Sequence, residues 1–499
     1  MLVSENIDLY RYEIHSLVKA FYPEEEVRVV VEGDPHAQKA RMEMGDPSLF
    51  VQMSADAITL TFAGKEPVSV CHGGPGEEEF KGPFNVKSRQ CKDALKSCLY
   101  TNLCAHTGKT LPWGDLIGIR PTKIAMTKME SGATKEDAVS FMENIHRVSP
   151  QKAQLAADIA VREKKILSGI HYDNGYSLYI GIPFCPTTCL YCSFPSNAIG
   201  LWKERVDDYL TALEKEMAAM APIFRDKVLD TVYFGGGTPT TLDPMQLDRV
   251  ITAVKRYFPN TDLQEFTVEA GRPDSITKDK LEVLRANGVT RISVNPQSMR
   301  QETLDLIGRL HSVQDVRDAF HTARCCGFDN INMDIILGLP GENIDDVRYT
   351  VGEVEKLGPD SLTVHSLAIK RASRMQKWIQ EHGMEEIHNT DDMMQVAAQG
   401  AERMGMKPYY LYRQKNMSGN FENVGYARPG RFGIYNILIM EEKQSILALG
   451  AGSISKIVMP CEQNGVPGTR IERCDNAKDV ATYIDHIDEM IGRKRALFE

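Results

Sequence analysis

The stretch "YSLYIGIPFCPTTCLYC", residues 176–192, sets three cysteines directly after a strand-like apolar run. Cys185, Cys189 and Cys192 form the pattern C-x3-C-x2-C, and Phe194 stands where a fourth thiol could follow. Structural zinc sites usually take four ligands from paired C-x2-C segments. Three thiolates can instead ligate three irons of a [4Fe–4S] cluster and leave one iron open. The spacing therefore predicts a cluster, with buried structural cysteines as the alternative.

Length and composition describe an ordinary globular chain. At 499 residues, the chain is too long for one core, so two or three domains are expected. The net charge of −10 gives no indication of the basic surface that binds nucleic acid. The first residues lack the apolar core of a signal peptide, and no apolar run is long enough to span a membrane. Eleven cysteines without export signals indicate a reducing compartment, and we expect a cytoplasmic protein.

Residues 1–172 have the pattern of an α+β domain. Two segments, 26–33 and 48–64, alternate apolar and polar residues as antiparallel strands do. Helical stretches follow them. These are expected at 88–105, 134–147 and 149–168.

Residues 173–369 repeat a strand-then-helix pattern six times. The strand-like runs are "SLYIGI", "DTVYFGG", "EFTVEA", "TRISVN", "NINMDIIL" and "SLTVHSLA", with helices expected from about 203, 243, 277, 312 and 344. The first helix carries one apolar stripe, formed by Val206, Leu210, Leu213, Met217 and Met220. Repeated βα units imply a parallel sheet, either doubly wound or closed toward a barrel. The alternation stops near residue 370, and residues 370–499 are predicted to form a C-terminal cap or substrate region.

Two motifs together resemble a known family. "YIGIPFCPTTCLYC" resembles the cluster loop of radical SAM enzymes, which bind S-adenosylmethionine (SAM) at the open iron of a [4Fe–4S] cluster. With "FGGGTPT" at 234–240, the chain is similar to the oxygen-independent coproporphyrinogen III oxidase (coproporphyrinogen dehydrogenase) family over roughly residues 176–455. The additional N-terminal domain is similar to that of the longer bacterial branch. The resemblance implies an α/β fold with a partial (β/α)6 radical SAM barrel and one or two bound SAM molecules.

The resemblance also implies a set of cofactor-binding residues. Alone, a glycine triplet serves tight turns and a carboxylate at a strand end can form an ion pair, so each position has a structural alternative. Asp334 suits ribose hydroxyls, and Arg309 suits a carboxylate. The implied cofactor-binding residues are Tyr179, Tyr191, Gly236, Gly237, Thr238, Glu269, Gln297, Arg309, Asp334 and Ala368.

Three cations follow the sixth predicted strand, at the end of a barrel where active sites lie. Lys370, Arg371 and Arg374 can hold substrate carboxylates; a solvated helix start is the alternative. The resemblance implies a porphyrinogen substrate, an unidentified electron donor, and oxidative decarboxylation of two propionates of coproporphyrinogen III to give protoporphyrinogen IX. No residue is assigned as an acid, base or nucleophile.

Two positions depart from the pattern of the oxidases. The oxidases have Tyr-x-His before the cluster loop, where this chain has Tyr179-Ile180-Gly181, and a fourth cysteine where this chain has Phe194. Related haem chaperones, which bind and deliver haem, also lack that fourth cysteine. A haem-binding chaperone is therefore the alternative function, and a radical SAM methyltransferase or other tailoring enzyme is a third.

Overall fold

The computed structural model describes residues 1–54, 57–71, 89–118, 120–194, 196–259, 262–370, 373–414, 417–463 and 466–499. The chain forms two compact units. The first consists of Met1–Ala160 and Tyr412–Glu422, and the second of Val161–Leu411 and Asn423–Glu499. Each unit is described on its own below.

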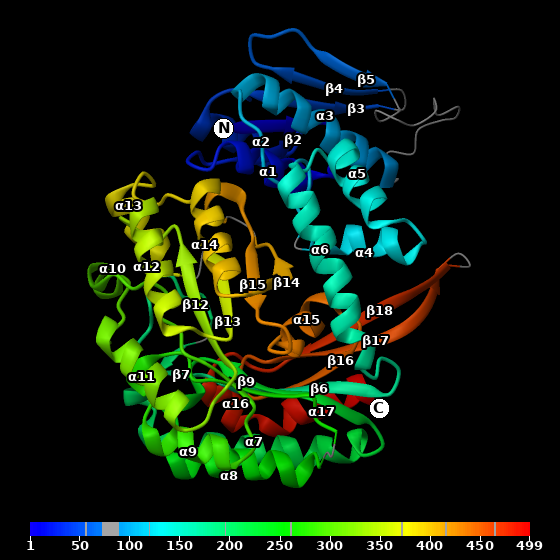
Figure 1. Ribbon diagram of the computed structural model, residues 1–499. Coiled ribbons are helices and arrows are strands. Elements are labelled where there is room, and N and C mark those ends of the chain that lie inside the picture. Colours follow the sequence, from blue (N-terminus) through cyan, green and yellow to red (C-terminus); the bar gives the residue numbers. More distant parts are fainter. Residues whose placement is uncertain are drawn as a thin grey trace. The chain divides into compact units, whose positions relative to one another are not determined.

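The first unit is an α+β domain built on a five-stranded mixed sheet in the order β2-β1-β3-β4-β5 (Figure 1). β1 lies parallel to β2 and β3, and the β3–β4–β5 meander is antiparallel. The strands are β1 (Leu2–Glu5), β2 (Arg28–Val31), β3 (Leu49–Met53), β4 (Ala57–Phe62) and β5 (Val68–Cys71). The helices are α1 (Arg11–Phe21), α2 (Pro35–Met44), α3 (Arg89–Thr107), α4 (Thr122–Glu130), α5 (Lys135–His146) and α6 (Pro150–Ile166), which crosses into the second unit.

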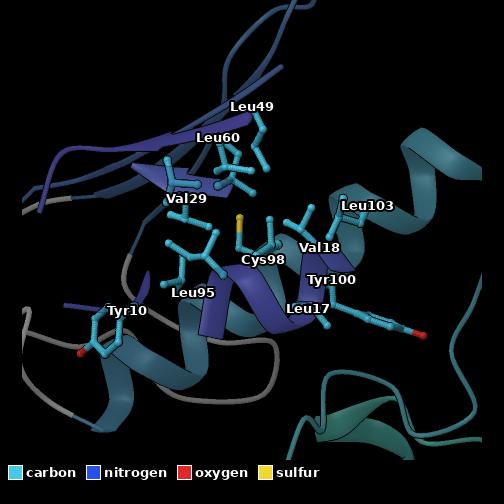
Figure 2. Close-up of a cluster of buried hydrophobic side chains, with 14 of the residues drawn as sticks. Tyr10, Leu17, Val18, Val29, Leu49, Leu60, Leu95, Cys98, Tyr100 and Leu103 are labelled. Atoms are coloured by element: carbon cyan, nitrogen blue, oxygen red, sulfur yellow. The ribbon is translucent and has the colours of Figure 1, made fainter. Parts of the chain in front are cut away.

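One hydrophobic core holds α1 and α3 against this sheet (Figure 2). Leu17 and Val18 of α1 and Leu95 and Leu103 of α3 are fully buried in it. Cys98 lies among them and is also buried. A free thiol in such a place behaves as a small apolar side chain.

The second unit contains six parallel strands in the order β6-β9-β10-β11-β12-β13. Strands buried on both faces read as near-continuous apolar runs, which is the pattern of the predicted segments. They are β6 (Gly175–Ile182), β9 (Val228–Gly236), β10 (Glu265–Glu269), β11 (Arg291–Ser293), β12 (Ile331–Leu337) and β13 (Ser361–Ser366). This arrangement confirms the α/β class and the six parallel strands of a partial barrel.

Helices connect the strands and cover the outer side of the sheet (Figure 1). The crossover helices are α7 (Val206–Met220), α8 (Pro244–Tyr257), α9 (Lys278–Ala286), α10 (Gln301–Leu306), α11 (Val313–Cys325) and α12 (Ile344–Leu357). All five residues of the predicted stripe on α7 are buried. Capping boxes start α8 at Asp243, α11 at Ser312 and α12 at Asn343. No helix in the described part of the chain is long and apolar enough to cross a membrane.

The C-terminal residues extend the barrel sheet at both edges. On one side β15 (Asn423–Ala427) pairs antiparallel with β13 and is followed by β14 (Lys407–Tyr412). On the other, β16 (Ser445–Leu449) pairs parallel with β6, followed by β17 (Ile454–Gln463) and β18 (Val466–Asp475). The remaining helices are α13 (Met375–His382), α14 (Asp391–Arg403), α15 (Ile434–Glu441), α16 (Val480–Asp485) and α17 (Ile487–Phe498).

This division of the chain differs from the predicted boundaries at 172 and 369. Residues 423–499 share hydrogen-bonded strands with the barrel and group with it. Residues 412–422 group with the first unit. Pairing between strands far apart in sequence produces the first difference, and hydrogen bonds of Glu422 and Arg413 to the first unit contribute to the second. The three-domain division stays a prediction.

Candidate functional site

The loop after β6 carries the three predicted cluster ligands. The short strand β7 (Phe184–Cys185) pairs with β8 (Asn197–Ala198), so the intervening residues form one excursion from the sheet. The amide of Leu190 donates to the carbonyl of Ile307 at 2.9 Å, which fixes the middle of the loop. Cys185 and Cys189 are buried, and Cys192 is partly buried. All three lie at the carboxyl end of a barrel strand, where sites on such folds are found.

The glycine motif after β9 packs directly on this loop. The amide of Gly237 donates to the carbonyl of Ile182, and that of Thr238 to the carbonyl of Phe184, each at 2.7 Å. A Cβ at Gly237 would lie 2.4 Å from the Phe184 oxygen. Gly236 has φ +106°, which favours glycine. The Thr238 hydroxyl lies 3.6 Å from the Cys185 sulfur. The close backbone approach therefore positions the cluster loop.

The burial of the three thiols bears on how they could bind a metal. Burial raises the pKa of Cys185 to about 11 and also raises that of Cys192, so a bound metal must supply the positive charge that favours thiolates. Across the described residues, no three His, Cys, Asp or Glu side chains lie close enough to bind one metal ion. A four-iron cluster takes each thiolate on a different iron and so holds its ligands farther apart. Cys185, Cys189 and Cys192 are therefore predicted to bind one iron each.

Two predicted cofactor carboxylates lie on barrel strands, Glu269 at the end of β10 and Asp334 in the middle of β12. Glu269, the last residue of β10, accepts a hydrogen bond from the Tyr233 hydroxyl. Burial raises the pKa of Glu269 to about 7. For Asp334 on β12, burial would raise the pKa, but the nearby His365 and a hydrogen bond from the Asn332 amide outweigh burial and lower it. The two acids therefore differ: Asp334 favours its charged form more strongly than Glu269 does.

Unpartnered polar atoms lie along the path that continues β11. The side-chain oxygens of Ser293, Asn295 and Gln297 are buried and have no hydrogen-bond partner among the residues that the structure describes. Gln297 also has φ +67°, a conformation that costs roughly 1–3 kcal/mol for a residue with a side chain. Buried polar atoms without partners are rare in native proteins. A polar ligand held at these strand ends would satisfy them, so the residues present fit SAM.

Arg309 joins this path to the cluster loop. Its Nη1 donates to the carbonyl of Asn295 at 2.6 Å and its Nη2 to the Tyr191 hydroxyl at 3.1 Å. Within the described part of the chain, Nε has no hydrogen-bond partner. Burial alone would lower the pKa of Arg309, but Tyr191 and Cys189 favour the cation and raise it. The predicted residues Tyr191, Arg309 and Cys189 are thus neighbours.

Tyr179 lies in an aromatic stack. Its ring is nearly parallel to those of Tyr233 and Tyr435, at centroid distances of 6.2 and 6.1 Å, and the latter two rings lie 4.5 Å apart. Tyr233 connects the stack to Glu269. Ala368 follows the end of β13 and is partly exposed, away from these contacts.

The predicted substrate cations fall at the start of the segment after β13. Arg374 is exposed, and its Nη2 donates to the Thr188 carbonyl of the cluster loop. The amide of Met375 donates to the Leu190 carbonyl at 3.0 Å. This segment therefore packs on the cluster loop. Lys370 is partly buried, and Arg371 lies outside the described residues.

Sequence reasoning missed three polar residues of the site. His365 lies 3.7 Å from Asp334, Tyr233 donates to Glu269, and Arg272 contacts Cys189. Tyr233 lies on β9 and His365 on β13. Because side chains along a strand alternate between its two faces, the period of two could have predicted that both point into the barrel. Arg272 lies in the loop after β10. Its charge, in the run "EAGRPD", is the one sequence signal that could have pointed to a role in the site.

Comparison with known proteins identifies the family. The radical SAM superfamily model matches residues 179–354. The oxygen-independent coproporphyrinogen-III oxidase-like protein HemZ of Bacillus subtilis is 42% identical over 420 residues, covering 82% of each chain. The chain belongs to the radical SAM family of oxygen-independent coproporphyrinogen III oxidase-like proteins. The cofactors of this family are a [4Fe–4S] cluster and SAM.

Shorter matches reach two functionally different relatives. The haem chaperone HemW of Bacillus subtilis is 38% identical over 39% of this chain and 51% of its own length. The oxygen-independent coproporphyrinogen III oxidase of Salmonella typhimurium is 35% identical over 38% of this chain and 42% of its own length. The solved coproporphyrinogen III oxidase of Escherichia coli aligns with a TM-score of 0.51 at 24% identity, covering 65% of this chain and 71% of its own. That likeness establishes the fold.

Proposed function

We propose that this protein oxidatively decarboxylates two propionates of coproporphyrinogen III to give the vinyl groups of protoporphyrinogen IX without oxygen. The packing of the Arg374 segment on the cluster loop is the observation that carries the proposal, since it puts one exposed cation, Arg374, next to that loop. A tetracarboxylate substrate requires such cations. The similarity to an oxidase-like protein over 82% of the chain supports it further.

In this proposal the chain's own residues bind and orient. Cys185, Cys189 and Cys192 hold the cluster, which together with SAM supplies a hydrogen-abstracting 5′-deoxyadenosyl radical. Asp334, whose pKa is lowered by its neighbours His365 and Asn332, would accept hydrogen bonds from the ribose hydroxyls of SAM. Arg309 offers its unpartnered Nε toward the SAM carboxylate. The remaining proposed cofactor contacts are Tyr179, Tyr191, Gly236, Gly237, Thr238, Glu269, Gln297 and Ala368.

The reaction consumes one SAM for each vinyl group formed. Each propionate loses a hydrogen atom, one CO2 and one electron, and the electron passes to an acceptor that the sequence does not specify. Lys370, Arg371 and Arg374 are proposed to hold the carboxylates that are not removed. A cytoplasmic location suits this chemistry, because a reducing compartment preserves free thiols.

A haem chaperone is the second candidate, and one observation favours it. Phe194 is 69% exposed where the oxidases carry a fourth cysteine, so this chain presents an apolar ring beside the cluster loop. A chaperone needs haem affinity, which an exposed aromatic ring can add to, and requires no substrate-linked cleavage of SAM.

Anaerobic turnover separates the two functions. We expect coproporphyrinogen III to stimulate 5′-deoxyadenosine formation by reconstituted, reduced protein, with one 5′-deoxyadenosine per vinyl group. Arg374→Gln and Arg371→Ala should reduce this stimulation at least several-fold while SAM binding persists, because the substrate loses a carboxylate partner. Arg348→Gln, an exposed arginine of α12, is the matched control and should behave as wild type. Stoichiometric haem binding without porphyrinogen-dependent SAM cleavage would instead assign the chaperone function.

A further inference from the structure

Arg272 is a buried arginine that reaches the cluster loop from the neighbouring strand end. It lies three residues past Glu269, the end of β10, and is 3% exposed. Its Nη1 donates to both the carbonyl and the hydroxyl oxygen of Thr187, at 3.1 and 2.7 Å. The same nitrogen lies 3.7 Å from the Cys189 sulfur, within hydrogen-bonding distance for sulfur. A permanent cation thus touches a predicted cluster ligand.

Asp274 fixes the direction of this guanidinium. Nε of Arg272 donates to Oδ1 of Asp274 at 3.0 Å, and Nη2 donates to Oδ2 at 2.7 Å. This is the bidentate geometry in which arginine–carboxylate pairs are strongest and most directional. With Nε and Nη2 held by one carboxylate, Nη1 must face Thr187 and Cys189. The pair therefore aims a donor at the sulfur.

A hydrogen bond and a positive charge at a ligand sulfur change the redox properties of a cluster. Cluster potentials depend on net charge, on hydrogen bonds to the sulfurs and on solvent exposure. Reduction adds one electron and makes the cluster with its thiolates more negative. A cation and a donor beside the sulfur stabilise the reduced form more than the oxidised form, and burial strengthens both effects.

We propose that Arg272 is a positioning residue that donates to the Cys189 sulfur and raises the reduction potential of the cluster, while the Asp274 carboxylate moderates its charge. The inference rests on Cys189 as a cluster ligand and holds for either function proposed above. Its experimental signature is a pair of opposite shifts. Removing the cation should make the cluster harder to reduce, and removing the carboxylate charge should make it easier to reduce.

Redox titration of the reconstituted full chain, followed by the electron paramagnetic resonance signal of the reduced cluster, tests this. We expect Arg272→Gln to lower the ratio of reduced to oxidised cluster about tenfold at a fixed potential, equivalent to about 59 mV for one electron. Arg272→Lys keeps the charge but cannot form the bidentate pair with Asp274. Its ratio of reduced to oxidised cluster should lie between those of Arg272→Gln and wild type. Asp274→Asn should shift the ratio in the opposite direction.

Arg324→Gln is the matched control. Arg324 also pairs with an aspartate, Asp360, and donates to backbone carbonyls, but no described contact joins it to a predicted cluster cysteine. Its removal should leave the potential unchanged. A wild-type potential in Arg272→Gln with a full cluster would overturn the proposal. If Arg272→Gln binds no iron, the reduction potential of Asp274→Asn decides the question. An unchanged or lower potential in that variant would refute the proposed role of Arg272. Cys189→Ala checks the premise separately, since retention of a full cluster would reject Cys189 as a ligand.

Discussion

Gly181 departs from the oxidase pattern for a packing reason. The Tyr209 hydroxyl donates to the Gly181 carbonyl at 2.6 Å and accepts from the amide of Ala451 at 3.1 Å. A Cβ at Gly181 would lie 3.3 Å from the Leu449 carbonyl. The end of β16 therefore lies close beside Gly181, and a side chain there would require the Leu449 carbonyl to shift by a few tenths of an ångström. The glycine identifies a local packing arrangement and does not by itself distinguish oxidase from chaperone.

Glu269 gives a pH-dependent prediction. Its pKa in the folded protein is raised to about 7, above the ordinary 4.5, so the folded state holds a proton that the unfolded chain has released. Its contribution to stability is therefore lost as pH rises from about 4.5 to 7. The free energy of unfolding of Glu269→Gln minus that of wild type should therefore increase from pH 5 to pH 8, by on the order of 1–3 kcal/mol.

Urea unfolding of the cluster-free protein, followed by tryptophan fluorescence at both pH values, measures this change. Glu302→Gln, which removes an exposed glutamate of α10, should follow the wild-type pH dependence. An identical pH dependence for Glu269→Gln and wild type would mean that the site leaves this carboxyl at its ordinary pKa.

The elements that the sequence predicted well are those with local signals. The apolar stripe on α7 and the buried runs of β9 and β12 depend on periodicity within one segment, so they could be located without knowledge of the fold. The pairing of β16 with β6 joins Leu447 to Leu178, far apart in the chain, and no local pattern encodes it. The same holds for Arg272, whose contact with Cys189 exists only after two strand ends meet.

The turn after β9 gives a prediction about an element. Gly237→Ala would place a Cβ 2.4 Å from the Phe184 carbonyl, and backbone cannot move aside as a flexible side chain can. We expect a loss of roughly 1–3 kcal/mol in stability and a lower iron content after reconstitution, because Cys185 follows Phe184. Gly200→Ala is the control, since nothing lies within 4 Å of its added Cβ and it should bind iron normally. Full iron binding by Gly237→Ala would show that the loop tolerates the shift.

The two units of the molecule do not follow one another along the chain, because each is built from two separate segments of the sequence. Residues 412–422 leave the barrel unit between β14 and β15 and complete the first unit. Within that unit Glu422 accepts hydrogen bonds from the Trp113 indole and the Lys152 ammonium, both at 2.7 Å. Arg413, also buried, donates to the carbonyl of Leu116. The first unit thus depends on a segment that lies more than 250 residues beyond its main part.

Substitution of Glu422 tests this dependence. Glu422→Gln removes a fully buried carboxylate and leaves the Lys152 ammonium, which is 7% exposed, without that charge. Removing one partner of a buried pair is strongly destabilising, so we expect a loss on the order of 3–5 kcal/mol in the stability of the first unit. Hydrogen exchange should then accelerate in α3, whereas the iron content and exchange of the barrel strands should match wild type. Arg470→Gln, a change on the exposed hairpin strand β18, provides the control. Unchanged exchange in α3 would show that residues 1–160 are stable without the inserted segment.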